Sequence, residues 1–135
     1  MRGYLLREQA IEPGTETFIE SPSEENNYAV VFEDDSDTGY FYAVEVNAQT
    51  GEQKILDALH IYQVEETEKP PPCVLKIIWS TDWLKCALVI DNKCHAVFDF
   101  ENHAGYNRSE FPPPNELWTK GSRELQEDKI LELFK

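Results

Sequence analysis

Short runs of β-branched and aromatic residues, separated by turn-forming residues, recur along most of this chain and constrain its fold more than any other feature. Such runs are typical of antiparallel strands, and the Gly, Pro, Asn, Asp and Ser residues between them are typical of turns. A short extended segment is expected around residues 17–19, and strands are expected at residues 28–32, 40–46, 54–64, 74–79, 84–90 and 94–100. The sequence therefore predicts an α+β fold that is mainly antiparallel β, a twisted meander or partly curved sheet of six to seven strands.

The run at residues 54–64 fits two patterns. Its apolar residues could form a helical stripe, or they could alternate between the two faces of a strand, with Asp57 and Leu59 on one face and His60 and Tyr62 on the other. Short strands and turns surround this run on both sides, so we favour the strand.

The hairpin formed by residues 84–90 and 94–100 has a predictable register. A one-residue slip would turn every side chain to the opposite face, so the turn must keep the apolar faces of the two strands together. A three-residue loop at 91–93 does this, whereas a two-residue loop would not. The predicted pairs are Ile90 with Cys94, Leu88 with Ala96, Cys86 with Phe98, Leu84 with Phe100 and, on the far face, Lys85 with Asp99.

The C-terminal residues 122–135 predict the one helix of the chain. Ser122 is a suitable N-cap, and the apolar residues Ile130, Leu131, Leu133 and Phe134 fall on one arc. The length of 135 residues fits a single domain spanning 1–135, with a charged, proline-rich connector at 65–72 inside it.

Negative charge is concentrated in the first half of the chain. The net charge is −14, and residues 1–72 hold sixteen acidic and four basic residues, against ten and eight in residues 73–135. This balance disfavours nucleic acid and anionic membranes, which attract clustered Lys and Arg. Two interpretations remain open for the densest acidic turn: a solvated edge that keeps the protein soluble, or a docking face for a basic protein partner. The residues of that candidate docking face are Glu33, Asp34, Asp35 and Asp37.

The cysteines and histidines do not form a recognisable catalytic or metal-binding pattern. Three cysteines without C-x-x-C spacing are typical of reduced thiols, and residues 1–8 lack the apolar region of a secretory signal, so we expect a cytoplasmic protein. Cys94 and His95 point to opposite faces of the predicted strand, which disfavours a shared metal. We therefore predict no catalytic residue, metal or cofactor, and the oligomeric state stays open.

Residues 95–114 form the most unusual segment, a strand end followed by a loop rich in polar and aromatic residues. Loops on a sheet scaffold often carry function. The candidate binding residues are His103, Tyr106, Asn107 and Arg108. Alternatively, Arg108 is largely buried and braces the loop by pairing with Asp99, Glu101 or Glu110, because an arginine fork suits a carboxylate. We favour this structural role.

Several segments together resemble a small family of uncharacterised bacterial proteins, a domain of unknown function. They are residues 57–62, 87–91, 95–100 and 107–109, with Phe111 and Pro112. The resemblance spans most of the chain and implies a bacterial cytoplasmic protein without an assigned activity, so no catalytic residue is carried over from it.

Two classes of function are consistent with these features. The first is a non-enzymatic protein-binding or interaction module, of which a toxin-neutralising immunity protein is one concrete form by class-level analogy. The second is a small ligand-binding domain or enzyme that uses the His95–Arg108 region. We favour the binding module.

Overall fold

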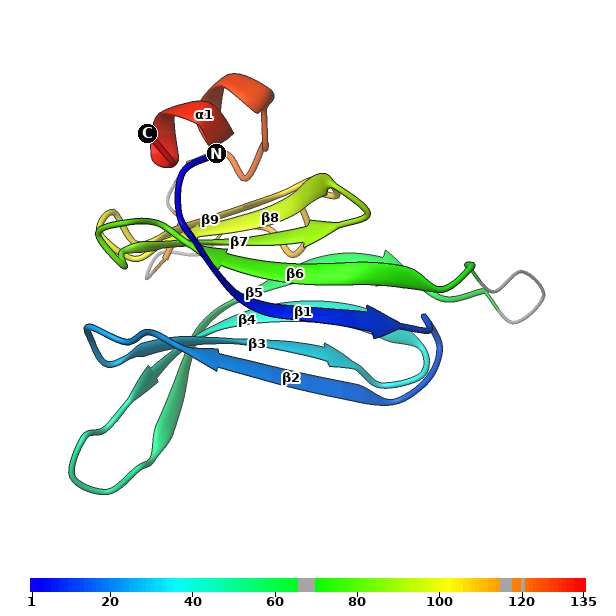
Figure 1. The fold of residues 1–135 in the computed structure, drawn as a ribbon, viewed down its shortest axis with the longest axis horizontal. Helices are drawn as coiled ribbons and strands as arrows, with labels where there is room; N and C mark the ends of the chain where they lie inside the picture. The colour runs from blue at the N-terminus through cyan, green and yellow to red at the C-terminus, as the bar shows by residue number, and fades with distance from the viewer. Residues whose placement is uncertain (66–69, 115–117, 120) are drawn as a thin grey trace.

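Two antiparallel sheets packed face to face make up the body of the protein, and one helix lies outside them (Figure 1). The computed structural model describes residues 1–65, 70–114, 118–119 and 121–135. Sheet A has the strand order β1 (Tyr4–Ile11), β6 (Cys73–Trp79), β7 (Lys85–Ile90), β8 (Lys93–Asp99) and β9 (Ala104–Asn107). Sheet B has the order β2 (Thr17–Pro22), β3 (Tyr28–Asp34), β4 (Thr38–Val46) and β5 (Gln53–Gln63), and the helix is α1 (Glu127–Leu133).

The mainly antiparallel α+β fold with one C-terminal helix is confirmed, and residues 54–64 lie almost entirely in strand β5. The described residues form nine strands instead of six or seven. The sequence did not indicate β1, in which every residue but Ile11 is at least partly exposed, so that β1 lacks clear alternation. It also did not indicate β9, a four-residue strand within the expected loop at 101–115.

A single hydrophobic core fills the space between the two sheets. Phe32, Phe41 and Leu59 from sheet B meet Ile77 and Phe98 from sheet A, all with fully buried side chains. The rings of Phe41 and Phe98 stack with their centroids 5.1 Å apart. Burial of this apolar surface is the main force that holds the sheets together.

The β7–β8 hairpin has the predicted register at its open end and a different turn. Lys85 lies opposite Asp99, Cys86 opposite Phe98 and Leu88 opposite Ala96, as expected. The loop has two residues, Asp91 and Asn92, both with positive φ, and a bulge at His95 compensates for the shorter loop. Asp and Asn tolerate this left-handed turn, which matches strand twist.

The bulge corrects the predicted facing of two residues at this turn. Ile90 lies opposite Lys93 instead of Cys94. Cys94 pairs with Val89 and faces away from the inter-sheet core, in a second cluster beneath the helix. A bulge inserts one residue into one strand only, so the alternation changes phase at that point.

The C-terminal helix is shorter than expected. It begins at Glu127, whereas the Ser122 hydroxyl accepts a hydrogen bond from the Glu124 N–H in a local turn. Residues before the helix are extended, with Glu124 bridged to Asn107. Leu131, expected on the apolar arc, is 63% exposed. Ile130 and Phe134, also expected on this arc, are buried, and together with Leu125 they cover the outer face of sheet A.

The predicted connector at 65–72 joins β5 to β6, and its residues 66–69 lie outside the described part of the chain. Within the described residues, no helix has the length and apolar character needed to cross a membrane.

Candidate functional site

Two of the four predicted binding residues, Tyr106 and Asn107, lie on β9, and His103 and Arg108 flank this strand. Their side chains have separate surroundings. His103 stacks on Trp118, with ring centroids 5.2 Å apart. Tyr106 points towards α1, where the Lys129 Nζ lies 4.2 Å from the ring centroid. Asn107 points the opposite way, into the space beside β5. The structure therefore does not gather these side chains around one cavity.

Arg108 is a brace between β8 and the C-terminal segment. Its Nε donates to the Cys94 carbonyl (2.9 Å), its Nη1 to the Leu125 carbonyl (3.1 Å) and its Nη2 to the Glu127 carboxylate (2.7 Å). The expected partners were Asp99, Glu101 or Glu110, so the acidic partner is corrected to Glu127. Helix α1 supplies this carboxylate from a distant part of the sequence, which local spacing could not predict.

Two of the expected partners are engaged elsewhere. The Asp99 carboxylate accepts hydrogen bonds from the backbone N–H groups of Glu101 and Asn102. The Glu101 carboxylate pairs with the Lys85 ammonium (3.1 Å). The predicted placement of Lys85 opposite Asp99 is thus correct, but its ion pairs form with Glu101, two residues beyond Asp99, and with Asp82 (3.0 Å).

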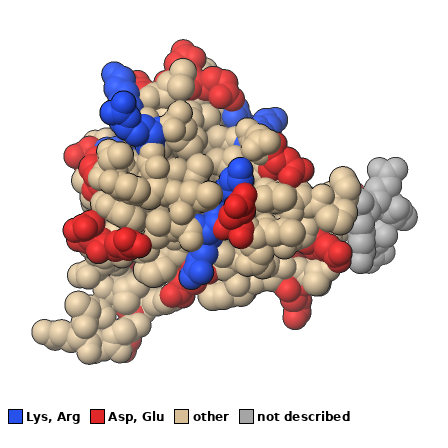
Figure 2. Space-filling model, viewed as in Figure 1, with Lys and Arg blue, Asp and Glu red and all other residues tan. Residues whose placement is uncertain are grey.

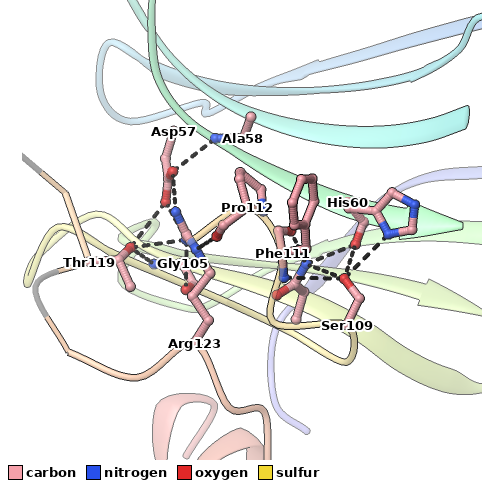
Figure 3. Close-up of polar contacts among 10 residues, drawn as sticks. Asp57, Ala58, His60, Gly105, Ser109, Phe111, Pro112, Thr119 and Arg123 are labelled. Atoms are coloured by element: carbon pink, nitrogen blue, oxygen red, sulfur yellow. Dashed lines mark hydrogen bonds and ion pairs between the residues drawn. The ribbon is translucent and has the colours of Figure 1, made fainter. Parts of the chain in front are cut away.

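Ser109 and His60 lie close together at the surface, with 3.3 Å between the serine Oγ and the imidazole Nδ1 (Figure 3). The Oγ also accepts hydrogen bonds from the Asn107 side-chain amide and the Phe111 N–H, at 3.2 and 3.3 Å. The hydroxyl itself donates to the His60 carbonyl (3.2 Å), so it connects the backbone of β5 to groups of the turn. The arrangement fastens the 107–111 turn to β5.

A buried ion pair that sequence analysis did not identify lies beside this turn (Figure 3). The Arg123 guanidinium donates to both Asp57 carboxylate oxygens at 2.8 Å, and the two side chains are 1% and 2% exposed. It also donates to the carbonyls of Pro112 and Gly105 and to the Thr119 hydroxyl. The alternation of residues 54–64 places Asp57 on the same face as the apolar Leu59, and this pattern could have indicated that Asp57 is buried. No local pattern indicated Arg123, which is 66 residues away in sequence.

The close packing around this pair requires glycine on β9. A Cβ at Gly105 would lie 2.7 Å from the Asp57 Oδ2, too close for van der Waals contact. The Thr119 hydroxyl accepts from the Gly105 N–H (2.7 Å) and donates to Asp57 (3.0 Å). Every donor of this cluster points to an oxygen within the protein, which makes it a structural clamp between the sheets and the C-terminal segment.

The four residues of the candidate acidic docking face have different environments. Asp34 is 2% exposed, and its carboxylate accepts from the N–H groups of Gly14 and Ser36 and from the Tyr62 hydroxyl. Asp34 therefore does not belong to a docking face, because its carboxylate is buried to satisfy these donors. Asp35 and Asp37 are exposed at the β3–β4 turn, and Glu33 lies on the outer face of sheet B.

Hydrogen bonds from the N–H groups of Thr38 and Asp37 lower the pKa of Asp35, so this exposed carboxylate is firmly ionised. Its negative charge therefore faces solvent at the β3–β4 turn.

The outer face of sheet B carries an apolar groove of about 260 Å³, which we call the sheet B groove. Strand alternation and register place its apolar side chains on this face: Phe18 on β2, Val31 on β3, Tyr42 and Val44 on β4, and Ile55 on β5. Glu33 and Gln53 complete its lining. Phe18 and Ile55 are each 63% exposed, so no described segment covers the two ends of the groove.

The surroundings of the sheet B groove are acidic. A second hollow of about 330 Å³ shares Phe18 and Glu33 with it and is also lined by Glu16 and Asp35. Strands β2 to β5 contain a single Lys or Arg, Lys54. Burial, followed by the negative charge of Glu33, raises the pKa of Tyr42. In Figure 2 the Lys and Arg atoms lie at the top and the centre of the molecule, and the central patch extends down towards sheet B. One cation lies at the β2 edge, where the Arg7 Nε donates to the Glu20 carbonyl (3.0 Å).

Burial is the main cause of the shifted pKa values of Cys86, Cys94 and His95. Burial raises the pKa of Cys94 to about 11 and that of Cys86 well above its usual value. Burial, together with the charges of Lys93 and Arg108, lowers the pKa of His95. Among the described residues, no three His, Cys, Asp or Glu side chains gather where they could hold a metal ion.

Comparison with known proteins gives a family without an assigned activity. The family model described as an uncharacterized protein conserved in bacteria, DUF2251, matches residues 11–135. A protein of Haemophilus influenzae named only as an uncharacterized protein is 39% identical over 97 residues, which cover 70% of this chain and 59% of that protein. The match thus spans about three fifths of the relative's length. No solved structure matches the chain.

Proposed function

We propose a function for a chain that belongs to DUF2251, a family of uncharacterized proteins conserved in bacteria: it is a non-enzymatic module that binds a basic protein partner. The partner docks on the outer face of sheet B, with the sheet B groove at the centre of the contact. The observation that carries this proposal is an apolar groove with exposed side chains at its two ends, Phe18 and Ile55, and an acidic margin.

The groove has the composition of a protein-binding surface. Two large apolar side chains, Phe18 and Ile55, stand 63% exposed at its ends, with smaller apolar side chains between them. Contiguous exposed apolar surface with a polar margin is typical of interaction sites. The acidic margin and the net charge of −14 favour a partner of opposite charge and disfavour a second copy of this chain.

The alternative, a ligand site at His103, Tyr106, Asn107 and Arg108, has less support. Each of these side chains already has a partner inside the protein, and their directions diverge. We also propose the cytoplasm as the compartment, because all three cysteines are free thiols and two of them are buried.

Site-specific photo-cross-linking in the bacterium tests the docking face. A photoreactive phenylalanine analogue is placed at Phe18, Ile55 or, as the matched control, Leu131 on α1, because all three side chains are 63% exposed. We expect Phe18 and Ile55 to cross-link the same basic protein, and Leu131 to leave it unlabelled. Labelling of the same proteins from all three positions, or of an acidic protein, would contradict the proposal.

Charge reversal then tests the acidic margin with the partner so identified. Glu16→Lys, Glu20→Lys and Glu33→Lys together should slow association, and added salt should slow association of the parent protein in the same way. The control reverses three exposed acids near α1, namely Glu124→Lys, Asp128→Lys and Glu132→Lys, with the same change in net charge. Equal slowing in both triple variants would show that net charge acts alone.

A further inference from the structure

We infer that the partner segment that occupies the sheet B groove is an amphipathic α-helix with Lys or Arg along its flanks. This inference rests on the proposed protein-binding function and adds the conformation of the bound segment. It follows from the direction of the groove, from the hydrogen-bonding state of the sheet and from the charges beside it.

The groove crosses the sheet diagonally. Phe18 lies opposite Glu33, and Val31 lies two residues before Glu33 and opposite Tyr42. Val44, two residues after Tyr42, lies opposite Ile55. From Phe18 to Ile55 the groove crosses three strand spacings and advances two residues twice along the strands. These two components give a diagonal of about 20 Å. A helix of about 13 residues has this length.

The face of a sheet can satisfy a helix but not an extended peptide. The backbone groups of β2 to β5 point sideways within the ladder, and their outer face presents only side chains. An extended segment over Val31, Val44 and Ile55 would bury its own N–H and C=O groups without partners. A helix bonds these groups internally and presents an apolar stripe to the groove.

The protein contains the same arrangement on its other sheet. Helix α1 and the residues on either side of it place Leu125, Ile130 and Phe134 over three small residues of sheet A, namely Ala87, Val89 and Val97. Sheet B has a comparable cluster of small residues, Ala29, Val31 and Val44, of which Val31 and Val44 line the groove. A second helix, from a partner, would complete sheet B as α1 completes sheet A.

The charges beside the groove determine the flanks of that helix. Glu33 lines the groove on one side, and Glu20 lies opposite Val31 on β2, where its carboxylate is held by the Gln53 side-chain amide (3.2 Å). A helix lying between Phe18 and Ile55 would place its flanking positions near these carboxylates. Lys or Arg at those positions would be attracted, and Asp or Glu repelled.

Three synthetic peptides of about 14 residues, each made of Leu and one charged residue, test this inference. In the first, Leu and Lys follow a helical period; the second has the same composition with strict alternation; the third has the helical period with Glu in place of Lys. Binding is followed by methyl and amide NMR signals of the intact protein. We expect the first peptide to shift the signals of Val31, Val44 and Ile55, and the other two to bind about tenfold more weakly or not at all.

Phe18→Ser and Ile55→Ser, both at exposed positions, should remove these shifts, whereas Leu131→Ser should retain them. Tighter binding of the alternating peptide, signal changes centred on α1, or an absence of binding by the first peptide would each overturn the helical inference. If the cross-links from Phe18 and Ile55 identify a basic partner despite such a result, the protein-binding proposal stands and only the helix is rejected.

Discussion

The outer faces of the two sheets are built from similar residues and have different environments. On sheet A, Ala87, Val89 and Val97 lie beneath the C-terminal segment and are fully or almost fully buried. On sheet B, Ala29, Val31 and Val44 form an equivalent cluster, flanked by the exposed Phe18 and Ile55. The chain thus covers one face with a helix. On the other face neighbouring side chains bury Ala29, Val31 and Val44, and the larger Phe18 and Ile55 stay exposed.

The charge asymmetry of the sequence follows the same division. Strands β2 to β5 lie within residues 1–72, where sixteen acidic residues stand against four basic ones. Most of sheet A and all of α1 lie within residues 73–135, where the two signs are nearly balanced. An apolar face inside a strongly charged half combines a driving force for association with selection of the partner's charge.

The largest effect is expected at the buried Asp57–Arg123 pair, which holds the C-terminal segment against sheet A. Arg123→Ala leaves the buried Asp57 carboxylate without its counter-ion, and should lower the free energy of unfolding by about 3–5 kcal/mol. Urea denaturation followed by the fluorescence of the buried Trp79 and Trp83 measures this loss. The double variant Asp57→Ala, Arg123→Ala should lose less than the sum of the single variants Asp57→Ala and Arg123→Ala, because neither charge is then stranded. Strict additivity would show that the two side chains do not act as a pair.

A pair of identical truncations compares the two faces directly. Ile130→Ala beneath α1, where the side chain is 4% exposed, should lower the free energy of unfolding by about 2–4 kcal/mol through lost burial and a cavity. Ile55→Ala on sheet B should cost under about 1 kcal/mol, because its side chain is already 63% exposed. Equal losses would mean that the sheet B groove is filled in solution.

A smaller effect is expected at Arg108, which links β8 to the C-terminal segment at Leu125 and Glu127. Its side chain is 28% exposed and its carboxylate partner, Glu127, is 75% exposed, so the ion pair itself contributes little. Arg108→Ala should cost about 1–2 kcal/mol, mainly through the unpaired carbonyls of Cys94 and Leu125. Amide hydrogen exchange should accelerate in α1 and stay unchanged in sheet B. A loss as large as that of Arg123→Ala would contradict the difference between the two arginines.

The smallest effect concerns the pH dependence of sheet A. The folded protein lowers the pKa of His95 from 6.5, so as the pH falls the unfolded chain binds a proton on this imidazole before the folded chain does. Stability should therefore decrease as the pH falls through the usual histidine range, and His95→Gln should reduce that decrease. The measurement compares unfolding midpoints about one unit above and one unit below pH 6.5, with His103→Gln as the control. Identical pH dependence in parent and His95→Gln would contradict the shifted pKa.

Residues with strong alternation could be placed from the sequence, because their periodicity records which face is buried. Cys86, Leu88, Ala96 and Phe98 were all expected in the core and are all fully buried. The two-residue turn and its bulge could not be inferred in the same way, since a bulge restores the alternation that a shorter loop would break. Strand β1 depends on pairing with β6, roughly seventy residues later, which its own pattern does not contain.

The candidate site shows a different limit. Arg108 drew attention because of its local isolation among acids, yet its partner comes from a helix that begins nineteen residues later. The residues next to Arg123 in the sequence form no pattern that would indicate its burial or its pairing with Asp57. The sheet B groove forms only when the register of four strands aligns Phe18, Val31, Val44 and Ile55. The pattern of each strand alone does not contain this register.

The buried Asp57–Arg123 pair also orders the events of synthesis on the ribosome. Sheet B consists of three successive hairpins that are complete at Gln63, so its strands can pair early in translation. The partners of its inner face and of the Asp57 carboxylate are made much later, since Arg123 follows Asp57 by 66 residues. Until that point the Asp57 carboxylate lacks its arginine partner, and we expect the net negative charge of residues 1–72 to repel neighbouring nascent chains. We therefore expect the charge of the first half to limit association of incomplete chains while sheet B lacks its covering sheet.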